Sequence, residues 1–537
     1  MNTTALLLAA AYGAPLVLAL ACAVPALRRA ALALTPLAPL PALAASLDAL
    51  AFGRIAARTP LLGLNFYLDA TGAVMMAAAS ALWIVAGLAA GPLKRGEGGT
   101  RFGVAWLLTL AGSMGVFAAT DLVTFYFVYA LVSLPAYALV VHDGDGEARR
   151  AGSVYLAFAI FGEALILLAF ALLAAGEPAG RLYIADVMAA LPNSPFAAPA
   201  IALAVAGFAM KIGLVPAHGF MPLAYTAAPC AAAAALSGAA VKAGVIGLLR
   251  FAPFGVHLPG LSEALTAAGL FSAFYGVAIG VLQKNPKTIL AYSSVSQMGV
   301  IAAVVGMGLS AGDPDAIIQT AFYGANHTLI KGALFLAVGL AMAQGGRRAV
   351  IVAPALLLAL SLGGLPLTGG ALAKLAVKDT LGGALVGWLA NVSAAGTTML
   401  MLHFVRALAL LPASRAARGH ASTAPWLAAA ALALALPFAL YPVLDEPFAK
   451  ALQPATLVEG LWPVLLGAAL AAVLRRYGAR LPSPPPGDLI VVEEAGARAL
   501  ASAGALVERG EYALRQWPAA TIAMMAIAAL IGLALAL

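Results

Sequence analysis

Four lysines lie inside apolar segments that are long enough to cross a bilayer: Lys211, Lys242, Lys331 and Lys374. A lysine at the centre of a bilayer costs about 2.5 to 3.5 kcal/mol on insertion scales, so a row of them is unusual. Amines that bind and release protons in turn can pass a cation along such a row. We therefore expect these four residues to belong to a proton pathway.

One acid lies deep in the first half of the chain. Glu163 occupies the middle of the apolar run FGEALILL. Intramembrane acids are costly, and a carboxylate favours the charged form of a nearby lysine. We predict that Glu163 pairs with Lys211. The alternative is a structural role, in which Glu163 binds a hydroxyl of a neighbouring helix.

Three histidines are further candidates for the pathway. His327 lies one helical turn before Lys331 and titrates near neutral pH, so it is either a proton relay that loads Lys331 or a satisfied core histidine. His218 follows Pro216 and either joins the pathway or binds carbonyls that the proline frees. His403 either faces an exit path or is structural.

Three charged residues near the ends of spans have a simpler interpretation. Lys378 is expected to extend its amine to the membrane surface. Asp69 and Asp121 each precede an apolar run, which is typical of a carboxylate at a helix N-terminus. We assign none of the three to the pathway.

Composition defines the class of protein. Of 537 residues, 63% are hydrophobic and 10% charged, whereas soluble domains carry about 25% charged residues. The chain is therefore predicted to be an all-α polytopic membrane protein, and its net charge of +8 reflects loops rather than nucleic-acid binding. Two isolated cysteines, Cys22 and Cys230, cannot hold an iron–sulfur cluster. We expect no cofactor, no metal, no catalytic residue and no enzyme activity of the chain alone.

Apolar runs near 20 residues predict about sixteen spans. They cover residues 4–25, 30–47, 69–90, 103–119, 121–141, 152–174, 199–220, 231–252, 261–283, 288–308, 315–343, 350–377, 383–410, 424–442, 457–474 and 517–537. The excess of arginine and lysine in alternate loops predicts that both termini lie on the non-cytoplasmic side. The first apolar run is interpreted as a retained helix, because its arginines follow it.

Two spans contain a proline beside a lysine, at Pro216 and Pro366. Breaks at membrane depth are tolerated where they are buried or line a wet cavity, and broken helices five spans apart indicate inverted repeats. We predict spans one to three in 1–102, one repeat in 103–252, the second in 253–410, and spans fourteen and fifteen in 411–480. Residues 481–537 are predicted to form a proline-rich linker, a cytoplasmic-side helix over 490–516 that is either amphipathic or an ordinary linker, and a final span.

Five strings resemble those of one superfamily. They are KIGLVPAHGFMPLAYTAAP (211–229), LSGAAVKAGVIGLLRF (236–251), KTILAYSSVSQMG (287–299), HTLIKGALFL (327–336) and SLGGLPLTGGALAK (361–374). Their order is similar to that of the antiporter-like, proton-conducting subunits of respiratory complex I, which also occur in Mrp-type Na+/H+ antiporters, group 4 hydrogenases and inorganic-carbon-uptake complexes. The resemblance covers residues 60–410 and implies a fourteen-helix core with two half-channels joined by a hydrophilic axis, in which all four lysines match functional positions.

The chain departs from this pattern at several positions. Ala130 stands where the family has the glutamate that pairs with Lys211. Gln297 replaces a common histidine, and Leu223 and Tyr225 replace an aspartate and a histidine. These departures predict that the first half conducts differently or less, and that Glu163 stands in for the missing acid.

Together these features predict a proton-translocating subunit of a larger complex in the bacterial cytoplasmic membrane, such as the ion-translocating part of a respiratory-type oxidoreductase. Its partners would be other membrane subunits, the lipid bilayer and H+. The first alternative is a subunit of an Mrp-type Na+/H+ exchanger. The second, which Ala130 favours, is a non-conducting or energy-coupling scaffold of a hydrogenase or carbon-uptake complex.

Overall fold

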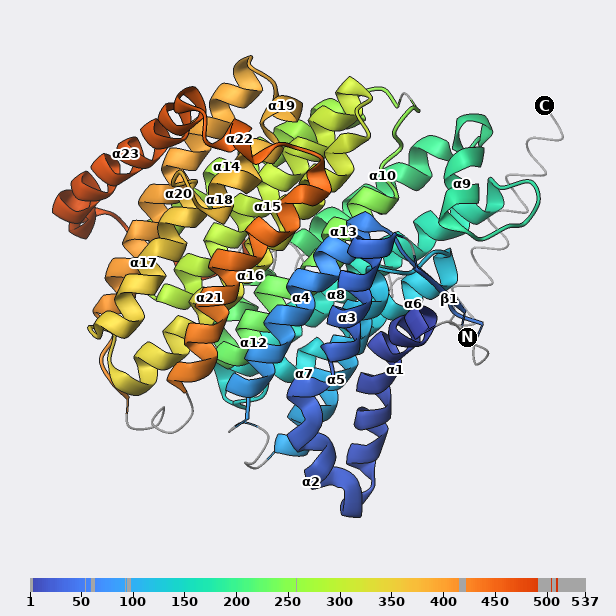
Figure 1. Cartoon of the computed structure of the whole chain (residues 1–537), viewed down its shortest axis with the longest axis horizontal. Coiled ribbons are helices and arrows are strands. Elements are labelled where there is room, and N and C mark those ends of the chain that lie inside the picture. Colours follow the sequence, from blue (N-terminus) through green and yellow to red (C-terminus); the bar gives the residue numbers. More distant parts are fainter. Residues whose placement is uncertain are drawn as a thin grey trace. The chain divides into compact units, whose positions relative to one another are not determined.

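The structure is a computed structural model that describes residues 3–53, 55–58, 63–91, 93, 98–256, 258–414, 422–490, 504 and 509 (Figure 1). The chain divides into two compact units, residues 1–486 and 487–537. Almost all of the second unit lies outside the described residues, so the helix over 490–516 and the span over 517–537 remain predictions.

The first unit is a bundle of helices with one short hairpin. In chain order the elements are α1 (Thr3–Ala23), α2 (Pro25–Leu34), α3 (Leu40–Phe52), β1 (Ile55–Arg58), β2 (Asn65–Leu68), α4 (Ala70–Ala89), α5 (Gly99–Val116), α6 (Leu122–Ser133), α7 (Ala136–Val140), α8 (Gly146–Ala175), α9 (Ile184–Ala190), α10 (Ala197–Ile212), α11 (Phe220–Ala227), α12 (Cys230–Ala235), α13 (Lys242–Arg250), α14 (Leu261–Gly280), α15 (Pro286–Ala311), α16 (Asp315–Gln344), α17 (Ala349–Gly363), α18 (Gly369–Ala376), α19 (Lys378–Leu381), α20 (Leu385–Ala409), α21 (Thr423–Leu440), α22 (Phe448–Ala451) and α23 (Pro454–Tyr477).

The predicted class of a polytopic helical membrane protein is confirmed. Twelve helices in the described part of the chain are long and apolar enough to cross a membrane. The predicted spans 103–119, 199–220 and 350–377 correspond to α5, to α10 with the turn that follows it, and to α17 with α18. The total of sixteen is not confirmed, and the division into inverted repeats remains a prediction.

Several helices are interrupted within the bundle. Helices α10 and α11 are separated by a turn that contains Pro216, and α17 and α18 by one that contains Pro366. Gly364 begins the second turn with φ 100°, a conformation that glycine adopts without a steric penalty. Between α12 and α13, residues Leu236–Ala240 form a π-helical turn just before Lys242. These interruptions place irregular backbone close to three of the four lysines.

The most buried helices lie at the centre of the bundle. Helix α16 packs against α4, α12, α15 and α21, and it carries both His327 and Lys331 (Figure 1). Buried positions occupy most of α15 and nearly all of the segment from Cys230 to Arg250. Polar side chains on these elements are therefore withdrawn from both lipid and bulk water.

The hairpin and two aspartates organise one end of the bundle. Strands β1 and β2 pair antiparallel, with Ile55 opposite Leu68. Asp69 and Asp121 accept hydrogen bonds from the backbone N–H groups of Gly72 and Thr124, each at 2.8 Å. These contacts confirm both aspartates as helix N-terminal residues. Asp69 also binds the guanidinium of Arg250 at the end of α13.

Candidate functional site

The centre of the lysine row is a contact between two helices. Lys242, at the start of α13, is 1% exposed, and its Nζ lies 2.9 Å from Nδ1 of His327 on α16. Lys331, one turn further along α16, is fully buried and donates to the carbonyl oxygen of Leu290 at 2.7 Å. These three basic side chains are close enough to interact electrostatically. Because like charges repel strongly in a low-dielectric interior, a proton on one group disfavours protons on the other two.

His327 contacts a different lysine from the one that the sequence suggested. The spacing of four residues puts His327 and Lys331 on one face of α16, but the Nδ1 atom of His327 faces Lys242. Its Nε2 atom has no hydrogen-bond partner among the described residues. His327 therefore stands between the lysines of α13 and α16. Its role as a relay remains a prediction.

A chain of hydroxyl groups lies beside Lys331, and sequence reasoning missed it. The carbonyl of Leu290 also accepts from the hydroxyl of Ser294 at 3.2 Å, and that hydroxyl lies 3.0 Å from the hydroxyl of Ser237. Ser237 belongs to the π-helical turn that precedes Lys242. Serine is common in membrane helices and usually bonds its own helix, so the sequence carries no signal for this contact.

Polar side chains continue from α16 to α15 and α20. Tyr323 lies one turn before His327 and donates to the amide oxygen of Gln297 at 2.7 Å. The amide nitrogen of Gln297 donates to the hydroxyl of Thr397 at 3.1 Å. Tyr323 and Thr397 both line a cavity of about 550 Å³, and so does Lys374. Gln297, which departs from the family pattern, thus connects a tyrosine of the core with the cavity wall.

Lys374 reaches into this cavity from α18, the helix that follows the second break. A side chain at Gly364 would bring its Cβ to 2.6 Å from Cδ of Lys374, so the glycine leaves room for the lysine stem. A cavity of this size can hold many water molecules. Lys374 therefore has access to water in a way that the buried lysines of α13 and α16 do not.

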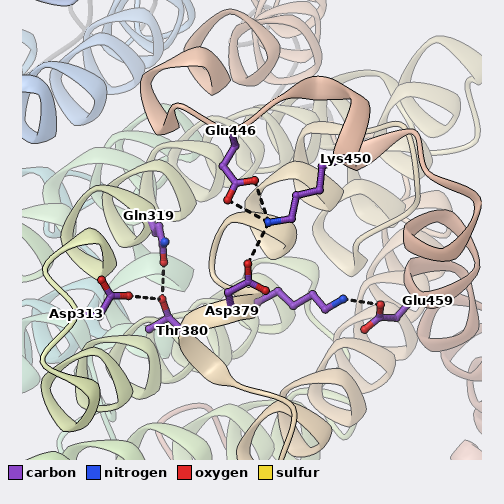
Figure 2. Close-up of polar contacts among 8 residues, drawn as sticks. Asp313, Gln319, Asp379, Thr380, Glu446, Lys450 and Glu459 are labelled. Atoms are coloured by element: carbon purple, nitrogen blue, oxygen red, sulfur yellow. Dashed lines mark hydrogen bonds and ion pairs between the residues drawn. The ribbon is translucent and has the colours of Figure 1, made fainter.

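Ion pairs lie around α19, close to one side of the cavity lining (Figure 2). Lys378 binds Glu459 at 2.6 Å, and both residues line the cavity. Lys450 binds Asp379 and Glu446, each at 3.0 Å, and the hydrogen bonds that its amine donates to Glu446 and Asp379 raise the pKa of Lys450 above its usual value. The side chain of Lys378 is 47% exposed and has an ion-pair partner, and its extension to the membrane surface remains a prediction.

The first half contains a smaller and more enclosed cluster. Lys211, in the last turn of α10, donates to the hydroxyl of Ser133 at 2.6 Å. Its Nζ lies 5.5 Å from the ring centre of Tyr129 and 5.9 Å from that of Tyr155. Glu163 on α8 is 6% exposed and interacts electrostatically with Lys211. No direct ion pair or hydrogen bond joins these two residues in the described part of the chain, and Oε1 of Glu163 has no hydrogen-bond partner there.

The remaining two histidines lie against backbone carbonyls. His218 is buried, with Nδ1 3.3 Å from the carbonyl oxygen of Pro216. His403 places Nε2 2.8 Å from the carbonyl oxygen of Gln283 and lines a separate cavity with Arg406. Both positions suit a structural role, and their place in a pathway remains a prediction.

Comparison with known proteins gives the family. Residues 119–402, just over half of the chain, match the family described as NADH:quinone oxidoreductase/Mrp antiporter, transmembrane. Hydrogenase-4 component B of Escherichia coli is 31% identical over 290 residues, which is 51% of this chain and 43% of that protein. NADH-quinone oxidoreductase subunit N of Desulforudis audaxviator is 31% identical over 304 residues, which is 54% of this chain and 58% of that protein.

Solved structures share the fold. The Mrp complex from a Dietzia species matches with a TM-score of 0.76 and 23% identity, over 99% of this chain and 62% of that one. An archaeal membrane-bound sulfane sulfur reductase matches with a TM-score of 0.66 and 20% identity, over 87% of this chain and 100% of that one. The chain spans about half the length of the curated relatives it matches. This multi-pass membrane protein belongs to the NADH:quinone oxidoreductase/Mrp antiporter family.

Proposed function

We propose that this chain is a proton-translocating, antiporter-like subunit of a larger complex in the bacterial cytoplasmic membrane. The observation that carries the proposal is the buried contact between Lys242 and His327, with Lys331 one turn away. Three titratable bases at this depth are costly to keep unless they exchange charge. Lys211 and Lys374 extend the row into the two halves of the chain.

The central step needs only groups that are already in contact. A protonated Lys242 donates its proton to Nδ1 of neutral His327 across 2.9 Å, which leaves a neutral amine and an imidazolium. The new charge on His327 then repels a proton on Lys331. A proton bound at one end of the row thus favours release at the other. The free energy for repeated cycles comes from a partner subunit. In the proposed orientation, both termini of the chain lie on the non-cytoplasmic side of the membrane.

Two other functions are alternatives that the same experiment addresses. A Na+/H+ antiporter subunit A1 of Staphylococcus aureus is 28% identical over 347 residues, so sodium exchange is one of them. The other is a non-conducting scaffold, which Ala130 in place of an acid would suit. Sodium exchange predicts a flux that depends on Na+, and a scaffold predicts a flux that does not change when a buried lysine is lost.

The test is proton flux through the complex that contains this chain, reconstituted in liposomes with a pH-sensitive dye inside. We expect Lys331→Ala to lower the flux by roughly a hundredfold, the order of effect of losing a positioned proton-transfer group. Lys284→Ala, which changes an exposed lysine just before α15, is the matched control and should keep the wild-type flux. Flux that requires Na+ would favour exchange, and wild-type flux in Lys331→Ala would refute conduction.

A further inference from the structure

A cavity of about 530 Å³ lies between the last turns of α20 and α23, and none of the four lysines of the row lines it. Two arginines do: Arg406, in the last turn of α20, and Arg475, in the last turn of α23. Both helices are long and apolar enough to cross a membrane, so we expect their ends to lie near its surface. The two guanidinium groups therefore share one space at the membrane boundary.

Small side chains keep this space open. Helix α23 approaches α20 closely at Gly467, where a Cβ atom would lie 2.4 Å from the carbonyl oxygen of Ala395. Further along the pair, Ala409 on α20 and Ala471 and Ala472 on α23 line the cavity. Side chains of one carbon cannot fill the gap between helices whose axes lie about 8 to 10 Å apart. The cavity thus opens beyond a point where the two helices are already in contact.

The positive charge at this end of the helix pair is not compensated. None of the described residues that line the cavity is acidic. Neither Arg406 nor Arg475 has an ion-pair or hydrogen-bond partner for its side chain in the part of the chain that the structure describes. Near the start of α23, by contrast, Glu459 binds Lys378, so the charges cancel there. Because two guanidinium groups repel each other, a space that they share favours an anion between them.

His403 completes the polar wall of the cavity. Its Nε2 atom lies 2.8 Å from the carbonyl oxygen of Gln283, and a carbonyl only accepts, so this nitrogen carries a hydrogen. The side-chain amide of Gln283 in turn donates to the carbonyl oxygen of Pro484 at 3.2 Å. These contacts hold the imidazole in place whether or not it is charged. The permanent charge of the cavity therefore comes from the two arginines.

An exposed apolar stripe of α23 leads into the cavity. Leu466, Leu470 and Val473 are 41, 40 and 55% exposed, and their spacing puts them on one face of the helix. Leu474, on the same face one turn after Leu470, lines the cavity. In a spanning helix, such a stripe is suited to contact with hydrocarbon chains. A ligand that fits both parts has an anionic head and an apolar tail.

We propose that this cavity is a binding site for an anionic phospholipid, whose phosphate lies between Arg406 and Arg475 and whose acyl chain follows the apolar stripe of α23. A guanidinium group donates parallel N–H bonds that match the oxygens of a phosphate. Basic pockets between spanning helices on the cytoplasmic side are suited to such headgroups, and the predicted orientation puts this end of α23 on that side. The site does not depend on proton conduction, so the two proposals stand or fall separately.

The test adds phosphatidylglycerol to the complex that contains this chain, after detergent has removed its bound lipid, and measures the bound lipid by native mass spectrometry. Arg406→Gln and Arg475→Gln should each weaken binding about fivefold, and both together about 25-fold. Arg476→Gln loses the same charge at the next position of α23, outside the cavity lining, and should keep the wild-type affinity. Equal weakening by all three single substitutions would show a general attraction of charge and would overturn the site.

A second pair of variants keeps both arginines. Ala472→Phe puts a ring into the cavity and should weaken binding about fivefold or more, whereas Ala469→Phe, exposed on the same helix outside the lining, should not. Wild-type affinity in Ala472→Phe and in the double arginine variant would overturn the site.

Two further ligands test the kind of anion. Phosphatidylcholine with the same acyl chains should bind more weakly than phosphatidylglycerol, because its choline cancels the charge of its phosphate; equal binding would overturn the preference for an anionic lipid. Inorganic phosphate in large excess should leave phosphatidylglycerol bound, since it has no acyl chain to follow α23. Complete displacement by inorganic phosphate would mean a site for the free anion and would contradict the lipid assignment.

Discussion

The two halves of the lysine row differ in how water reaches them. Lys211 lies among aromatic rings beside a cavity of about 20 Å³, whereas Lys374 lines one of about 550 Å³. The first lysine has an acid and a hydroxyl close by. The second faces a cavity that can hold many water molecules, and ion pairs lie near α19. The lysine of the first half is thus surrounded by side chains, whereas the lysine of the second half faces space that water can fill.

This difference teaches where a substitution should matter. In the enclosed half, each polar atom has few substitutes, so removal of one group should interrupt proton transfer. In the wide cavity, water can bypass a missing side chain. The buried contact between Lys242 and His327 joins α13 to α16 between these two halves. It resembles neither, because its two groups touch each other directly.

Among the changes that test this comparison, the largest loss of proton flux is expected when the acid of the enclosed half, Glu163, is replaced. Glu163→Gln should lower proton flux by roughly a hundredfold, the order of effect of losing a positioned proton-transfer group. Adding Ala130→Glu should recover at least half of the flux. Ala130 lies one turn before Ser133 on α6, so a glutamate there extends toward Lys211.

The control for the added acid is Ala130→Gln in the same Glu163→Gln background, which has the shape of glutamate without its charge. Recovery with glutamine would show that charge is irrelevant at this position. If Ala130→Glu recovers no flux, Glu163 on α8 does not serve in place of a glutamate at position 130 on α6.

A smaller effect is expected from filling the wide cavity. Ala371→Phe places a ring beside Lys374 and should lower flux about threefold, because some of the water that serves the lysine is displaced. Ala428→Phe, on an exposed face of α21, adds the same ring outside the cavity and should leave the flux unchanged. Loss as severe as that of Glu163→Gln would mean that the second half is as tightly constrained as the first.

The smallest effect concerns the ion pairs around the wide cavity. Lys450→Met should lower the free energy of unfolding by about 0.2 to 1 kcal/mol, because the pairs are partly exposed and solvent screens them. Since Glu446 and Asp379 raise the pKa of Lys450, its contribution is complete at neutral pH and is lost as pH rises through that raised value. Thermal unfolding in detergent at pH 7 and at pH 11 measures this. An equal difference between the proteins at both pH values would contradict the assignment.

The class of helical membrane protein and the position of the lysines within apolar helices could be predicted from the sequence, because both depend on local composition. A lysine within twenty apolar residues needs no tertiary information to be noticed. The break near Pro366 follows in the same way from the absent N–H of proline. The split of the second predicted span into α2 and α3 was missed, although Pro36, Pro39 and Pro41 mark the place where α2 ends and α3 begins.

The contacts between helices could not be predicted in this way. Periodicity puts His327 and Lys331 on one face but does not say that α13 packs there, so the bond from His327 to Lys242 was unforeseen. Ser133 gave no signal, because a serine in a helix usually bonds a carbonyl of its own helix. Both findings depend on which helices are neighbours in the bundle.

The most direct test of the account is proton flux in the reconstituted complex with Lys331→Ala beside its control Lys284→Ala. We expect the buried substitution to lower the flux by roughly a hundredfold and the exposed one to leave it at the wild-type value. Equal flux in the two variants, with both proteins folded and assembled, would contradict the claim that protons travel along this row of lysines.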